Sequence, residues 1–149
     1  MRIGLGLLLA GCAAQPPGNA LLATAAGRPS GMARLWVFRP PAGSSETAMP
    51  SDPMLFVNGA PVARSTPGTL FFHDLQPGTC RLSLAARGAP PSLAETLQLA
   101  PGMEVYLQVR AQPDAAAGTA AGAGNFGALA MSAAEAKPYL AGLTELGER

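Results

Sequence analysis

The sequence has few of the side chains from which most active sites are built. Its 149 residues include a single histidine, His73, two cysteines and only 13% charged residues. A metal site made from histidine and cysteine needs more ligands than this chain offers. The ten basic residues are scattered, whereas nucleic-acid binding needs clustered lysine and arginine. We therefore expect no metal, no cofactor and no nucleic-acid partner.

Catalytic patterns are equally scarce. Asp74 follows His73 directly, and because adjacent strand residues point to opposite faces, that carboxylate cannot orient that imidazole. No serine stands in a Gly-x-Ser-x-Gly motif, and the glycines at 118, 122 and 124 lack the lysine of a phosphate-binding loop. We expect no catalytic residue, with a catalytic His73 as the alternative. The acidic residues fall mostly in expected turns and near the termini, as solvated side chains do: Glu46, Asp52, Asp74, Glu95, Glu104, Asp114, Glu135, Glu145 and Glu148.

The amino-terminal segment has the pattern of a bacterial lipoprotein signal. Arg2 is followed by an apolar run that is too short to span a bilayer, and the segment ends in Leu9-Ala10-Gly11-Cys12. This tetrapeptide matches the lipobox, in which small residues admit the signal peptidase and the cysteine thiol accepts a diacylglyceryl group. The pattern predicts a signal peptide over residues 1–11 and a lipidated Cys12. A chance cysteine and an ordinary secretory signal are the alternatives.

Several expectations follow from a lipidated Cys12. Several acyl chains would anchor the protein firmly to a membrane, and Ala13 rather than aspartate favours the periplasmic face of the outer membrane. Residues 12–31 are rich in alanine, proline and glycine, which predicts a flexible lipidated tether. Removal of Arg2 leaves nine basic and nine acidic residues, so the net charge becomes 9 − 9 = 0. Cys80 then has no disulfide partner within the chain and is expected to be a buried core thiol.

The rest of the chain predicts short strands separated by turns. Glycine (18) and proline (15) are abundant, and both favour turns over long helices. Asn58-Gly59 is a strong signal for a tight hairpin, and Pro61 indicates that the returning strand lies at a sheet edge. We predict a mainly β fold, a small antiparallel β-sandwich of about seven strands over residues 32–146. The expected strands are 33–39, 54–57, 60–63, 69–73, 79–86, 96–99 and 104–110.

Two of these strands carry informative side-chain patterns. In the seventh, Val105, Leu107 and Val109 should point inward and Tyr106, Gln108 and Arg110 outward. In the first, Trp36 and Phe38 share a face with Arg34, while Ala33, Leu35 and Val37 share the other. Two apolar faces are typical of a central strand with its aromatic side chains in the core. An exposed Trp36 that serves as a platform for a sugar or peptide is the alternative.

The last third of the chain contains a low-complexity stretch and a helix signal. Residues 113–125 are mostly alanine and glycine and are expected to form a mobile loop, and residues 126–131 could add a last strand. Ser132 and Glu135 match a capping box, which predicts a helix over 132–146 that Pro138 weakens or bends. Its expected apolar stripe contains Tyr139, Leu140, Leu143 and Leu146.

Four segments occur in an order that resembles a known group of proteins. They are residues 34–39, Val57-Asn58-Gly59, residues 75–79 with the strand after them, and the final strand and helix with an Ala-Lys pair and two leucines. Over about residues 32–146, the chain resembles small uncharacterised bacterial lipoproteins whose β-domain has no known function. Residues 77–82 also resemble turns of transthyretin-like and PEGA-like sandwiches, which usually carry an aromatic where this chain has Cys80. The resemblance implies a fold and a cell-envelope location, and no activity.

Three functional hypotheses remain open. The leading one is a membrane-anchored cell-envelope lipoprotein that acts without catalysis as a binding or assembly accessory, with an envelope protein or peptidoglycan as partner. The second is a periplasmic enzyme or enzyme inhibitor with a cleft near His73 and Trp36. The third is a structural surface protein that self-associates through the alanine- and glycine-rich insert.

Overall fold

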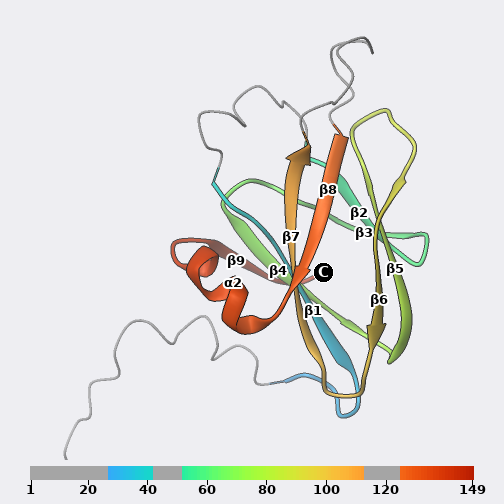
Figure 1. The fold of residues 1–149 in the computed structure, drawn as a ribbon, viewed down its shortest axis with the longest axis vertical. Coiled ribbons are helices and arrows are strands. Elements are labelled where there is room, and N and C mark those ends of the chain that lie inside the picture. Colours follow the sequence, from blue (N-terminus) through green and yellow to red (C-terminus); the bar gives the residue numbers. More distant parts are fainter. Residues whose placement is uncertain (1–26, 42–51, 113–124) are drawn as a thin grey trace, which may run out of the picture.

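The computed structural model describes residues 27–41, 52–112 and 125–149, which form nine strands and one short helix (Figure 1). The strands make a five-stranded sheet and a four-stranded sheet that enclose a shared apolar core. The protein is therefore mainly β, and the predicted fold class is confirmed. The signal segment, Cys12, the tether up to residue 26 and the insert at 113–124 lie outside the described residues.

The two sheets draw on strands that are far apart in the sequence. The five-stranded sheet has the order β8-β7-β1-β4-β9 and the four-stranded sheet the order β3-β2-β5-β6. The strands are β1 (Ala33–Arg39), β2 (Met54–Val57), β3 (Ala60–Arg64), β4 (Thr69–Leu75), β5 (Gly78–Ala85), β6 (Ser92–Leu99), β7 (Glu104–Gln112), β8 (Asn125–Met131) and β9 (Thr144–Glu148).

β1 is the central strand of the larger sheet, and all seven of its residues are buried. It pairs antiparallel with β4 and parallel with β7, and β4 pairs parallel with β9. The larger sheet is therefore mixed rather than wholly antiparallel as expected. Parallel neighbours need a long connection, and the chain between β1 and β7 contains β4 and the whole four-stranded sheet. Turn signals in the sequence identify hairpins but carry no information on such distant pairings.

The hairpin between β2 and β3 forms as the sequence predicts. Asn58 has φ 49° and Gly59 has φ 86°, the left-handed backbone that a tight two-residue turn requires. β3 has only β2 as a neighbour, so Pro61 lies in an edge strand, where proline is tolerated.

The core between the sheets is built from alternate residues of their strands. Leu35 and Val37 of β1 face the same cluster as Val105, Leu107 and Val109 of β7, as the alternation predicts. From the four-stranded sheet, Leu55, Cys80, Leu82 and Leu84 contribute. Cys80 is 2% exposed, and its prediction as a buried thiol is confirmed.

A second apolar cluster lies on the opposite face of the larger sheet. Trp36 stands across from Phe72 on one side and Tyr106 on the other, so three strands contribute one row of aromatic rings. Helix α2 (Ala133–Leu140) covers this face, and Figure 1 shows it on the side of the larger sheet away from β5 and β6. Trp36 is 1% exposed, which confirms the core interpretation and contradicts the exposed platform.

The helix also corrects the expectation for the outward side chains of β7. Tyr106 and Gln108 do point away from the sandwich core, but both are buried, and only Arg110 is exposed. Tyr106 belongs to the cluster that α2 covers, with Ala136 as the fully buried helix residue. Period-two alternation identifies the two faces of a strand, but it does not reveal that a distant helix covers the second face.

The predicted helix over 132–146 is correct at its start and wrong at its end. The Ser132 side chain accepts from the Glu135 N–H, and the Glu135 carboxylate accepts from the Ser132 N–H, so the capping box is confirmed. The helix stops at Leu140, Gly142 takes φ 83°, and the chain continues as β9. Pro138 lies inside the helix, where it removes one backbone hydrogen bond. Of the expected stripe, Leu143 is buried, whereas Tyr139 and Leu146 are exposed.

Candidate functional site

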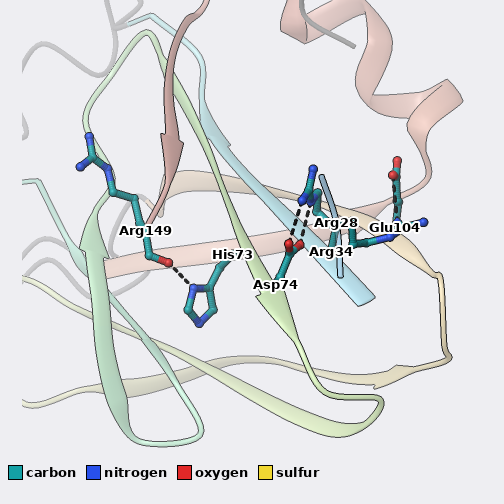
Figure 2. A network of polar contacts seen from close by, with 6 residues as sticks. All are labelled: Arg28, Arg34, His73, Asp74, Glu104 and Arg149. Atoms are coloured by element: carbon teal, nitrogen blue, oxygen red, sulfur yellow. Dashed lines mark hydrogen bonds and ion pairs between the residues drawn. The ribbon is translucent and has the colours of Figure 1, made fainter. Parts of the chain in front are cut away.

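A buried ion pair lies on the outer face of the larger sheet, between β1 and β4. Arg34 Nε and Nη2 each donate to one oxygen of the Asp74 carboxylate at 2.7 Å (Figure 2). The two side chains are only 2% and 4% exposed. The hydrogen bonds from Arg34 to Asp74 raise the pKa of the guanidinium above its usual value. Asp74 is thereby committed to a structural role, on the face opposite His73.

Aromatic rings surround the guanidinium of Arg34. Its Cζ atom lies 3.9 Å from the centre of the Phe72 ring and 5.7 Å from that of Trp36. Its Nη1 and the indole Nε1 of Trp36 are buried without a hydrogen-bond partner. The ring faces compensate part of the lost hydration of the cation, because their π-electrons attract positive charge. The guanidinium of Arg34 is therefore held by both the Asp74 carboxylate and the aromatic row.

A second ion pair joins the start of the described chain to β7. Arg28 Nη1 lies 3.0 Å from Glu104 Oε1, with both side chains partly exposed (Figure 2). The backbone reinforces this contact, because Arg34 N donates to Met103 O and Gly102 N donates to Met32 O. The segment that leads into β1 is thus fixed alongside the turn that leads into β7.

His73 and Trp36, the centre of the enzyme hypothesis, lie on opposite faces of the larger sheet. His73 pairs with Leu35 and so shares its face, whereas Trp36 belongs to the aromatic row under α2. His73 Nδ1 contacts the backbone oxygen of Arg149 (Figure 2). The structure therefore does not bring these two residues together in one cleft.

A second arginine is buried at the other end of β1. Arg39 is 1% exposed, its Nη1 donates to the Ser65 carbonyl oxygen at 3.1 Å, and the Asp52 carboxylate lies 3.5 Å away. Its guanidinium lies 5.3 Å from the centre of the Phe126 ring. These contacts connect β1 to the residues that flank the β2–β3 hairpin and to β8, and they assign Arg39 to the packing of the sandwich.

An open groove of about 370 Å³ lies where β6, β7, β8 and the start of α2 meet. Its volume is at the lower end of the range for small-ligand sites. Apolar side chains dominate its lining, and two carboxylates also border it: Leu97, Met103, Val105 and Met131, with Glu104 and Glu135. Glu104 is bound by Arg28. Hydrogen bonds from Ser132 lower the pKa of Glu135 and hold its carboxylate at the helix start. The groove therefore suits an apolar occupant.

The two cysteines and the remaining sequence candidates do not form a site among the described residues. Cys12, the predicted lipidation site, lies outside the described residues, and so do the glycines of the insert. Burial raises the pKa of the Cys80 thiol, which makes the reactive thiolate scarce. Within the described ranges, no group of three histidine, cysteine, aspartate or glutamate residues could hold a metal ion. No helix in the same ranges is long and apolar enough to cross a membrane.

The sequence interpretation did not identify the Arg34–Asp74 pair or the groove. A signal for the pair existed, since Arg34 stands among apolar residues on both faces of a central strand and must therefore find a carboxylate. Its partner is 40 residues away. The groove forms between elements that are far apart in the chain, and no local pattern marks it.

Comparisons with known proteins add no identification. No family model matches the chain, and no curated protein matches it. The resemblance to small bacterial lipoproteins thus stays a prediction, based on the order of its segments.

Proposed function

We propose that this protein is a membrane-anchored lipoprotein of the bacterial cell envelope, in which a β-sandwich acts without catalysis as a binding or assembly accessory. The observation that carries the proposal is the sequence Leu9-Ala10-Gly11-Cys12 after an apolar run. In this proposal the acyl groups on Cys12 hold the protein at the membrane, and Ala13 directs it to the periplasmic face of the outer membrane.

The spacing between the anchor and the domain suits this arrangement. β1 begins at Ala33, so 32 − 12 = 20 residues separate Cys12 from the first strand. A chain of that length spans at most about 70 Å when fully extended. It joins the domain at its central strand, which has neighbours on both sides. A pull on the anchor would first load the contacts of residues 28–34 with residues 102–104, and then β1 itself.

The contacts of Asp74 and Trp36 support a binding role over the enzyme hypothesis. Asp74 is bound through both oxygens to a buried arginine, and Trp36 is packed between Phe72 and Tyr106. Side chains in such contacts stabilise a domain and are not free to act on a substrate. The groove between β6, β7, β8 and α2 is a concave, mostly apolar surface of the described residues, and in this proposal it serves recognition.

Fractionation of cells that express tagged protein tests the anchor. The unsubstituted chain should sediment with membranes and incorporate a labelled fatty acid, and Cys12→Ser should abolish both. Cys80→Ser is the matched control, because it also replaces a cysteine and should leave both properties unchanged. Fatty-acid labelling that persists in Cys12→Ser, or its absence from the unsubstituted chain, would contradict the proposal.

The role as an accessory needs a partner, which affinity capture can reveal. Captures from detergent-solubilised envelopes should recover an envelope protein or peptidoglycan with the unsubstituted chain. The same partner should be recovered less efficiently with Cys12→Ser, because the domain is no longer concentrated at the membrane. Hydrolysis of peptidoglycan by the purified protein, lost on substitution of His73, would instead support the enzyme hypothesis.

A further inference from the structure

The groove between β6, β7, β8 and α2 has two properties that define an occupant. Leu97, Met103 and Met131 make its lining apolar, and Met103 is 40% exposed, so apolar surface is open to an occupant there. The bordering carboxylates are already bound, Glu104 by Arg28 and Glu135 by Ser132. An uncharged apolar segment therefore fits the groove better than a basic or polar ligand.

The chain itself approaches this groove from its amino-terminal side. Arg28 is held by Glu104, which borders the groove, at 3.0 Å. The backbone from Met32 to Arg34 is hydrogen-bonded to residues 102 and 103. Residue 27, where the described chain begins, is therefore within about one arginine side chain of the groove.

The preceding residues have the composition that the groove requires. Residues 20–26 read Ala-Leu-Leu-Ala-Thr-Ala-Ala, without a charge, proline or glycine. Leu21 and Leu22 are the large apolar side chains nearest to residue 27 on that side. We propose that the groove binds residues 20–26 of the same chain, with Leu21 and Leu22 packed against Met103 and Met131.

This docking would set the reach of the anchored domain, a consequence that rests on the proposed lipidation of Cys12. With residues 20–26 bound, only 19 − 12 = 7 residues separate the anchor from the domain surface. Their extended length is at most about 25 Å, against about 50 Å for residues 13–27 when residues 20–26 are not bound, since Arg28 stays paired with Glu104. The groove would thus hold the domain close to the membrane, and a partner that displaces the leucines would release it.

Methyl NMR on the full-length chain with Cys12→Ser tests the docking, independently of lipidation. With leucine and methionine methyl groups labelled, we expect nuclear Overhauser effects from Leu21 or Leu22 to Met103 or Met131. Substitution of both leucines by serine should remove these effects and shift the signals of Met103 and Met131. The signal of Met54, which lies on β2 in the other sheet, should not move.

Two controls make the result decisive. Leu7→Ser with Leu8→Ser changes a leucine pair in the signal segment and should leave the contacts intact. Mixing two differently labelled samples should give no contacts between molecules. Absence of the Leu21 or Leu22 contacts, their loss in the signal-segment control, or contacts only between molecules would each overturn the proposal. The proposed function would fail separately, through absence of acylation at Cys12.

Discussion

Replacement of Asp74 by asparagine should destabilise the domain strongly, because it leaves the Arg34 charge buried without its partner. The Arg34 and Asp74 side chains are 2% and 4% exposed and share two hydrogen bonds of 2.7 Å. Asparagine keeps the shape of aspartate but not its charge. Removal of one partner from a buried pair typically costs about 3–5 kcal/mol of unfolding free energy. That loss is a large share of the roughly 5–15 kcal/mol that stabilises an ordinary domain.

A double substitution that removes both charges separates the cost of an unpaired charge from the contribution of the pair to stability. In Arg34→Met with Asp74→Leu, both charges are absent, and the new side chains extend the apolar cluster of Trp36 and Phe72. Buried pairs replaced by packed apolar residues often lose no stability. We expect the double variant to lie within about 1 kcal/mol of the unsubstituted protein or above it.

Urea unfolding followed by tryptophan fluorescence measures both effects. Trp36 is the only tryptophan, and it is 1% exposed beside the pair, so its emission reports on this region. If Asp74→Asn does not fold, the double variant still tests the reasoning. A loss below about 1 kcal/mol in Asp74→Asn, the value typical of exposed pairs, would refute it. So would a double variant that is as unstable as the single one.

Three further predictions concern other parts of the domain. Cys80 should resist alkylation in the folded protein and react on unfolding, because burial raises its pKa; rapid labelling of the native protein, followed by mass spectrometry, would contradict this. The Glu135 cap should stabilise α2 above the unfolded pKa of about 4.5 and weaken as pH falls, because its folded pKa is lowered. The Ser132 amide shift should therefore titrate below pH 4.5, and not in Glu135→Gln. Gly142→Ala should cost about 1 kcal/mol in urea unfolding, since φ there is 83°; no loss would argue against this turn.

Local signals in the sequence were sufficient to predict several features of the fold. Asn58-Gly59 fixes a hairpin because few residues tolerate its backbone, and the structure has that turn. The alternation of β7 places Val105, Leu107 and Val109 in the core. Ser132 and Glu135 mark the helix start through hydrogen bonds between near neighbours. Each signal depends on residues close in sequence, which explains why it could be recognised.

Features that depend on distant contacts were not predictable in the same way. The spacing of Leu143 and Leu146 suits a helix, but α2 ends at Leu140, and Thr144–Glu148 pairs with β4 as a strand. Tyr106 was expected outward and is buried because α2 covers it. The Arg34–Asp74 pair and the groove likewise bring together separate strands. Tertiary pairing overrides local preference in these places.

The amino-terminal peptide of protein purified from native membranes tests the central claim most directly. Its mass, measured after proteolysis, should correspond to a chain that begins at Cys12 and carries a diacylglyceryl group on the thiol. An additional acyl group on the new amino terminus is also expected. A peptide with an unmodified Cys12 thiol, whether uncleaved or cleaved elsewhere, would contradict the account of this protein as a lipid-anchored β-sandwich.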